Sequence, residues 1–228
     1  MTIQTILWDV DGTLLDFLAA EKAAIQALFL EFGLGPCTEE MVARYSALND
    51  AYWKRLERGE ITKAQVLTGR FRDFFSEVGV DPDLAVPFNA RYQVALGDTI
   101  VYRDDSLKIV KSLHGRVKQY VVSNGTVVAQ TRKLRRSHIG DWMDGVFLSE
   151  ELGAEKPSPA FFEKVFAALP DIPKENMLIV GDSLTSDMKG GLLAGVPTCW
   201  YNPGRQKRPE EMALDYEIQD LHQIYELL

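Results

Sequence analysis

Two aspartates near the start of the chain are the residues best placed to do chemistry. They belong to the sequence Asp-Val-Asp-Gly-Thr at residues 9–13, directly after an apolar run at residues 6–8 that predicts a buried strand. Gly12 lets backbone N–H groups approach an anion. We interpret Asp9 as a candidate nucleophile and Asp11 as a candidate general acid and base.

Two further loops could bind and neutralise an anion. Ser123 and Asn124 begin a Ser-Asn-Gly-Thr sequence after an apolar run, and they offer a hydroxyl, an amide and a helix N-terminus to phosphate oxygens. Lys156 stands in a Glu-Lys-Pro sequence and could neutralise charge shared by Asp9 and a phosphoryl group. Taken alone, each loop is also an ordinary turn, helix cap or solvated segment.

A fourth loop carries two more acids. Asp182 and Asp187 follow the apolar residues 179–180, and their carboxylates could complete an oxygen-ligand site for Mg²⁺. The order of the four loops, each beside a predicted strand or helix, favours a common site over four unrelated turns. Loops at the carboxyl ends of parallel strands converge on one crevice, so we expect these side chains to meet there.

Hydrophobic periodicity predicts the elements that position these loops. Strands are expected at residues 6–8, 117–122, 145–148, 177–180, 196–201 and 216–218, with helices at 106–113, 126–137, 159–169, 186–194 and 221–228. Strands that alternate with helices imply a parallel, doubly wound, Rossmann-like α/β sheet. Residues 17–97 have a helical period with breaks that leave about four helices. We therefore expect a core of residues 1–16 and 98–228, interrupted by an all-helical cap of residues 17–97.

Composition limits the class of protein and its partners. Of 228 residues, 46% are hydrophobic and 25% charged, which is typical of a globular protein, and the formal net charge is −8. This charge argues against a nucleic acid polymer or an anionic membrane as partner. Cys37 and Cys199 are isolated, which favours reduced thiols and a cytoplasmic location. We expect a mature N-terminus, because no basic leader precedes the first strand. For the oligomeric state, the sequence is compatible with both a monomer and a homodimer.

Together the four motifs closely resemble those of the haloacid dehalogenase superfamily, whose phosphatases carry them in this order on a Rossmann-like core. The resemblance covers essentially the whole chain, and the expected helical cap is similar to the family's first cap type. It implies that Asp9 attacks phosphorus and that Asp11 protonates the leaving oxygen. The family's serine and lysine roles would fall on Ser123 and Lys156.

The resemblance also implies a Mg²⁺ site. Its ligands would be the Asp9 carboxylate, the main-chain carbonyl of Asp11 and the Asp182 carboxylate, with Asp187 acting through water. The cofactor expected from the sequence is therefore Mg²⁺, and the expected reaction is hydrolysis of a phosphate monoester through an aspartyl-phosphate.

Parts of the cap and of the last core strand point to a substrate class. The segments at residues 49–54, 59–62, 69–71 and 199–202 are similar to the pyrimidine 5′-nucleotidase branch of the family, which implies a nucleoside monophosphate as substrate. Aromatic residues of the cap could stack on a base, although a helical bundle of this size must also bury aromatic side chains. The candidate substrate residues are Phe17, Asn49, Trp53 and Arg70.

Other functions stay open at this point. A phosphoglycolate or sugar-phosphate phosphatase would share the chemistry, and a β-phosphoglucomutase would return the phosphoryl group to a sugar. A haloacid dehalogenase would use Asp9 on carbon and would need neither Asp11 nor an acidic metal site. A catalytically silent interaction module is the alternative from another class, and the intact motifs argue against it.

Overall fold

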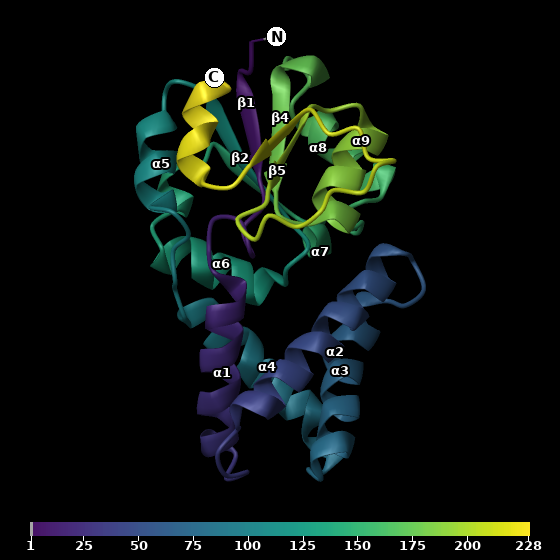
Figure 1. Cartoon of the computed structure of the whole chain (residues 1–228). Coiled ribbons are helices and arrows are strands. Elements are labelled where there is room, and N and C mark those ends of the chain that lie inside the picture. Colours follow the sequence, from purple (N-terminus) through teal and green to yellow (C-terminus); the bar gives the residue numbers. More distant parts are fainter. Residues whose placement is uncertain (1) are drawn as a thin grey trace. The chain divides into compact units, whose positions relative to one another are not determined.

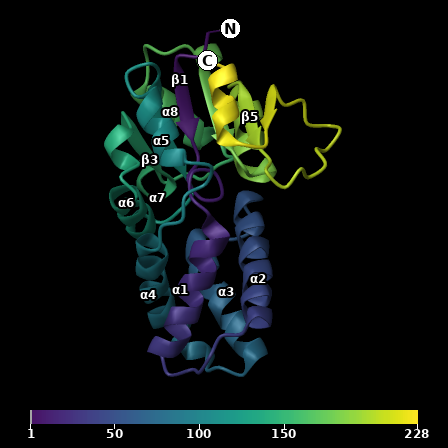
Figure 2. The same ribbon diagram turned by 60° about the vertical axis from the view of Figure 1, so that its left-hand side comes forward.

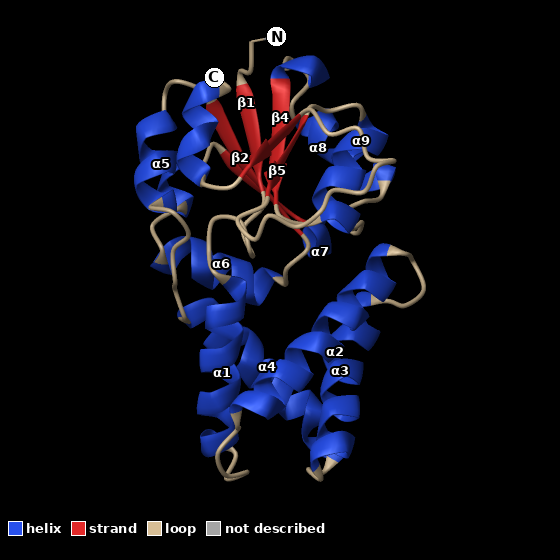
Figure 3. Ribbon diagram, in the orientation of Figure 1, coloured by secondary structure: helices blue, strands red, loops and turns tan. Residues whose placement is uncertain are grey.

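A six-stranded parallel sheet forms the centre of the first of two compact units in the computed structural model, which describes residues 2–228 (Figures 1 and 3). This α/β unit comprises residues 2–16 and Ile100–Leu228. Its strands are β1 (Thr5–Trp8), β2 (Lys118–Ser123), β3 (Gly145–Leu148), β4 (Met177–Gly181), β5 (Thr198–Tyr201) and β6 (Tyr216–Ile218). Their order, β3-β2-β1-β4-β5-β6, confirms the predicted doubly wound, Rossmann-like sheet.

Helices cover both faces of this sheet because successive strand residues point to opposite sides. The helices of this unit are α5 (Ser106–Leu113), α6 (Val127–Arg136), α7 (Ser149–Leu152), α8 (Pro159–Ala168) and α9 (Lys189–Ala194). In β1, Ile6 and Trp8 belong to one apolar cluster with α5 and α6, whereas Leu7 packs in a second cluster with α8. Figure 1 shows α5 and α8 on opposite sides of the sheet.

One helix begins differently from the sequence-based expectation. The segment expected as a helix from residue 186 starts as a π-helical turn, Leu184–Met188, and continues as α9. Ser183 caps this turn, since its side chain accepts a hydrogen bond from the Ser186 N–H. Wide turns of this kind often occur at functional sites, and this one carries Asp187.

The second unit, Phe17–Thr99, is entirely helical (Figure 2). Its α-helices are α1 (Phe17–Glu31), α2 (Glu39–Glu57), α3 (Lys63–Val78) and α4 (Ala85–Asp98), as expected from the glycine and proline breaks. Thr38 and Thr62 cap α2 and α3. Fully buried aromatic rings, among them Phe29, Phe71 and Phe88, form the centre of the bundle. Across residues 2–228, no helix combines the length and apolar character needed to cross a bilayer.

Candidate active site

The candidate site lies where the strand order of the sheet reverses. β1 pairs with β2 on one side and with β4 on the other, and ligands of open α/β sheets bind outside the carboxyl ends of such strands. Asp9 directly follows β1 and is 7% exposed, and its backbone N–H donates to the Val180 carbonyl at 2.9 Å. The end of β1 therefore holds Asp9 beside the loop that follows β4.

Lys156 links Asp9 to a second carboxylate. It is 1% exposed, and Nζ donates to Asp9 Oδ1 at 2.9 Å, to Asp187 Oδ1 at 2.5 Å and to the Val122 carbonyl at 2.7 Å. An ammonium has three donors, so all three are used. Asn124 holds the lysine's main chain, because its amide donates to the Lys156 carbonyl and accepts from the Lys156 N–H, both at 2.8 Å.

Burial and neighbouring charges act against each other at this contact. Burial raises the pKa of Asp9 to about 7, against the lowering effect of the Lys156 ammonium, and repulsion from Asp187 adds to the rise. Burial alone would lower the pKa of Lys156, but Asp187 and Asp9 outweigh it and the pKa is raised. Lys156 therefore stays charged, whereas extra positive charge near Asp9 would favour its ionised, nucleophilic form.

Three carboxylates at this edge of the sheet could hold a metal ion. Carboxylate oxygens of Asp9, Asp182 and Asp187 all lie within 4.8 Å of one another, and we call this set the carboxylate cluster. Desolvation and repulsion from Asp9 and Asp187 raise the pKa of Asp182 well above its ordinary value. One ammonium faces three acids, and oxygen donors suit a hard divalent cation, so the cluster fits Mg²⁺.

Two residues of the first loop fix the geometry of the carboxylate cluster. The Thr13 hydroxyl lies 3.2 Å from Asp9 Oδ2 and 3.4 Å from Asp182 Oδ1, and it accepts from the Asp182 N–H at 3.1 Å. Gly12 has φ +95°, and a Cβ there would lie 2.3 Å from Asp182 Oδ2. A residue with a side chain would therefore displace Asp182.

The other motif residues lie in the same unit with different contacts. Ser123 is buried, and its Oγ accepts from the Gly125 N–H at 3.0 Å, which leaves the hydroxyl hydrogen to donate. The Asp11 carboxylate contacts Gln130 and Lys133 of α6. The roles predicted for Ser123, Asn124 and Asp11 toward a phosphate ester stay predictions.

Sequence reasoning missed three of the residues that hold this site. Thr13 lies in the first motif, but the motif pattern assigns its hydroxyl no role. Gln130 and Lys133 lie three positions apart on one face of the helix that follows the Ser-Asn-Gly loop, a spacing that is also typical of solvated polar residues. A lysine on an amphipathic helix normally lies in solvent, so the burial of Lys133 cannot be predicted from the helix pattern.

The four candidate substrate residues lie in the helical unit. Phe17 and Trp53 are half-buried, whereas Asn49 and Arg70 are 3% and 2% exposed. Arg70 Nη1 donates to Asn49 Oδ1 at 2.5 Å, and Asn49 Nδ2 donates to Glu21 Oε2 at 2.8 Å. Asn49 and Arg70 thus already have partners within this unit, and contact of any of the four with substrate stays a prediction.

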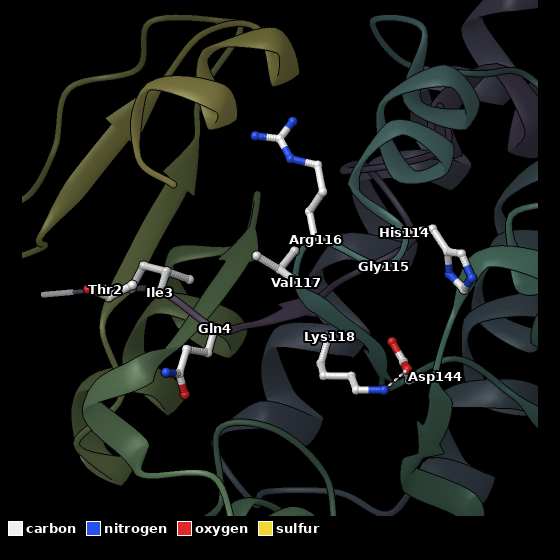
Figure 4. Close-up of a pocket in the computed structure, with 9 residues that line it drawn as sticks. All are labelled: Thr2, Ile3, Gln4, His114, Gly115, Arg116, Val117, Lys118 and Asp144. Carbon is white, nitrogen blue, oxygen red and sulfur yellow. Dashed lines mark hydrogen bonds and ion pairs between the residues drawn. The ribbon is translucent and has the colours of Figure 1, made fainter.

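A separate pocket lies at the opposite ends of the strands (Figure 4). It has a volume of about 380 Å³ and is lined by residues before β1 and at the start of β2, including Arg116 and Lys118. Lys118 pairs with Asp144 at 2.7 Å, as the dashed line in Figure 4 marks. None of the motif residues lines this pocket, so it is distinct from the candidate site.

A doubly wound sheet with a helical insertion after its first strand, and an aspartate and a lysine in contact at the switch point, define a class of Rossmann-like hydrolases. The chain belongs to the haloacid dehalogenase-like hydrolase family, whose model matches residues 3–195, and this confirms the resemblance found in the motifs. It is 36% identical to the HAD-hydrolase YfnB of Bacillus subtilis over 99% of this chain and 95% of that protein.

Two further relatives match along almost the entire chain. Identity is 33% to the pyrimidine 5′-nucleotidase PynA of Streptococcus pneumoniae, over 100% of this chain and 96% of that protein. Identity is 28% to the pyrimidine 5′-nucleotidase YjjG of Escherichia coli, over 98% of this chain and 96% of that protein. Among solved structures, an orthorhombic crystal form of YfnB bound to magnesium has a TM-score of 0.92 at 35% identity, covering 100% of this chain and 99% of that one.

Proposed function

We propose that this hydrolase is a Mg²⁺-dependent phosphatase that hydrolyses small phosphate monoesters through an aspartyl-phosphate at Asp9, with pyrimidine nucleoside 5′-monophosphates as preferred substrates. The observation that carries the proposal is the contact of buried Lys156 with both Asp9 and Asp187 beside the carboxylate cluster. An anionic nucleophile that attacks an anionic phosphate needs positive charge close by, and this arrangement provides it.

The reaction divides into two displacements at phosphorus. A carboxylate oxygen of Asp9 bonds to phosphorus while the bond from phosphorus to the ester oxygen breaks, and Asp11 gives its proton to the departing alcohol. Water then attacks the aspartyl-phosphate, Asp11 takes a proton from it, and Asp9 is released. Lys156 neutralises charge on Asp9 and the phosphoryl oxygens. A Mg²⁺ ion bound at the carboxylate cluster would supply further positive charge there.

Groups of three loops are suited to hold the phosphoryl oxygens. The Ser123 hydroxyl has a hydrogen to donate, and the backbone around Gly12 is open to an anion. Asn124 supports this region by holding the main chain of Lys156. We therefore assign phosphate binding to Gly12, Ser123 and Lys156, with Asn124 contributing through the lysine loop.

The preference for pyrimidine nucleotides is supported by the relatives. PynA and YjjG are pyrimidine 5′-nucleotidases, and both match this chain over nearly its full length. The magnesium requirement is supported by the YfnB structure bound to magnesium and by the oxygen-rich donor set here. Phe17 and Trp53, the half-buried aromatic candidates, are the first residues to test for stacking on a base.

The test is a substrate panel with purified protein, in Mg²⁺ and in EDTA. We expect Mg²⁺-dependent release of phosphate, fastest from pyrimidine nucleoside 5′-monophosphates. Asp9→Asn should lower kcat by about 10⁴-fold or more, as expected for loss of a nucleophile. The exposed Asp171→Asn is the matched control and should retain full activity. Near-wild-type activity of Asp9→Asn, with its fold verified by circular dichroism, would show that the nucleophile is another residue.

The same panel separates the alternatives. Preferred hydrolysis of phosphoglycolate or a sugar phosphate would replace the nucleotide assignment and leave the aspartyl-phosphate chemistry standing. Interconversion of sugar phosphates without release of phosphate would indicate a β-phosphoglucomutase. Release of halide from 2-haloacids in the absence of phosphatase activity would identify a dehalogenase and overturn the proposal.

A further inference from the structure

Two buried side chains of α6 hold the Asp11 carboxylate, and neither belongs to the four motifs. Gln130 Nε2 donates to Asp11 Oδ2 at 2.6 Å, and Lys133 Nζ forms an ion pair with Asp11 Oδ1. Each carboxylate oxygen therefore has its own donor. Two donors on different oxygens fix the rotation of the carboxylate as well as its direction.

Packing alone does not account for these side chains. Gln130 is 0% and Lys133 1% exposed. Taking an ammonium out of water is costly. Gln130 Oε1 is buried with no hydrogen-bond partner in the described part of the chain, which adds a further desolvation cost. An apolar residue of similar size would pack on this helix face without either cost, so the contacts with Asp11 explain why polar groups stand here.

The local structure of α6 is arranged for these contacts. Positions 130 and 133 lie on the same face of the helix, one turn apart. Thr126 caps the helix, since its side chain accepts from the Ala129 N–H at 3.2 Å. A Cβ on Gly125 would lie 2.2 Å from Gln130 Nε2, so the glycine of the Ser-Asn-Gly loop leaves the space that the glutamine occupies.

We propose that Gln130 and Lys133 are positioning residues that orient Asp11 for proton transfer. The proposal rests on the proposed phosphatase function, in which the Asp9–phosphorus bond forms, the ester bond breaks, and the Asp11 proton goes to the departing oxygen. Orientation of a catalytic group before the reaction lowers the barrier, because its rotational freedom is already restricted. In this scheme Gln130 and Lys133 contact the Asp11 carboxylate and not the substrate, so both act through Asp11.

Leaving groups of different basicity distinguish this role from a general structural one. A nitrophenolate departs without needing a proton, whereas an alkoxide requires one. A fault in the orientation of Asp11 therefore slows alkyl phosphates much more than p-nitrophenyl phosphate. A fault in folding, in metal binding or in phosphate binding slows both substrates alike.

The experiment measures kcat and KM of Lys133→Met and Gln130→Leu at saturating Mg²⁺, with p-nitrophenyl phosphate and with the best alkyl phosphate of the panel. We expect kcat for the alkyl phosphate to fall about 100-fold in Lys133→Met and about 10-fold in Gln130→Leu, within the range of general acid catalysis. For p-nitrophenyl phosphate, the expected fall is less than about fivefold, with KM little changed. Arg135→Met, at an exposed position of the same helix, is the control.

A double-mutant cycle with Asp11→Asn completes the test. If the two residues act through Asp11, then Lys133→Met has little further effect on the alkyl phosphate once Asp11 is replaced. Equal losses for both substrates, or additive losses in the cycle, would overturn the positioning role while the phosphatase stands. If Lys133→Met does not fold, Gln130→Leu carries the same comparison. Absence of phosphatase activity in the wild-type chain would overturn both proposals.

Discussion

The α/β unit and the helical unit both bury charged side chains, but they neutralise them in different ways. In the α/β unit, the Lys156 ammonium contacts the Asp9 carboxylate directly. In the helical unit, Glu21 and Arg70 are joined through the amide of Asn49, which donates to one and accepts from the other. Burial is the main cause that raises the pKa of both carboxyl groups, to about 7 for Asp9 and above the ordinary value for Glu21.

The balance of charge in the two sets indicates what each is for. The carboxylate cluster holds three acids near one ammonium, and this excess of negative charge suits a cation and an electrophile. In the helical unit, one carboxyl faces one guanidinium, and Ser46 and Asn49 each donate a hydrogen bond to a different oxygen of Glu21. We therefore expect changes in the first set to act on activity and changes in the second to act on stability.

The largest effect is expected from Lys156→Met. The substitution leaves Asp9 and Asp187 without their shared ammonium, and the phosphoryl group loses the positive charge that offsets its repulsion from Asp9. We expect kcat to fall about 10³-fold, a loss typical of removing one electrostatic contact from a transition state. Steady-state phosphate release at saturating Mg²⁺ measures it.

The exposed Lys189→Met serves as the control for this prediction. It removes the same charge from the same unit, on the helix that follows the Asp187 turn. A fall of less than tenfold in Lys156→Met would mean that the direct contact is structural, and the contrast between the two units would disappear.

The core of the fold could be predicted from the sequence because its signals are local. Apolar runs that end in glycine-containing loops marked the strands, and the expected strand at residues 145–148 coincides with β3. Glycine and proline breaks likewise marked the four helices of the helical unit. The π-helical turn at Leu184–Met188 was not predicted, because hydrophobic periodicity does not distinguish a wide turn from the start of an α-helix.

Some residues of the site could likewise be predicted from local motifs, whereas other contacts depend on tertiary packing. Asp9, Lys156 and Asp187 stood in motifs beside strands or helices, so their meeting followed from the rule for parallel sheets. The contacts of Asp11 with α6, and of Glu21 with Arg70 through Asn49, depend on side chains brought together by tertiary packing. Nothing in their spacing distinguishes them from solvated polar residues, because burial of a charge is decided by neighbours far along the chain.

A smaller effect, on stability, is expected from Arg70→Met. Loss of the guanidinium leaves Glu21 buried without its nearby cation and leaves Asn49 Oδ1 without a donor. We expect the helical unit to lose about 3 kcal/mol, since breaking a buried charge set by removing one partner is strongly destabilising. Hydrogen exchange measured by mass spectrometry on peptides from α2 and α3 localises the loss to this unit.

Arg72→Met, at an exposed position two residues away, should leave this exchange unchanged. Comparison of Arg70→Met with Arg72→Met also tests the predicted substrate role of Arg70. An increase in KM for nucleotides that exceeds the increase for p-nitrophenyl phosphate, with exchange rates unaltered, would mean that Arg70 binds substrate instead of stabilising the bundle.

The smallest effect is a change in the pH dependence of stability in Glu21→Gln. The pKa of Glu21 is raised on folding, chiefly by burial, so its contribution to stability is fully present below about pH 4.5 and is lost as the pH rises through the folded value. Glutamine does not titrate. The free energy of unfolding of the variant, relative to wild type, should therefore increase from pH 4 to pH 7, as measured by urea titrations.

Glu39→Gln in the same unit provides a control of opposite sign. Glu39 is exposed, and its hydrogen bond with Lys22 lowers its pKa, so its contribution is present above about pH 4.5 and is lost as the pH falls through the folded value. The free energy of unfolding of Glu39→Gln, relative to wild type, should therefore decrease over the same rise in pH. If the relative free energy of unfolding changed with pH in the same direction in both variants, burial would not be the cause that sets the pKa of Glu21. The comparison of Glu21 with Asp9 as desolvated carboxyl groups would then fail.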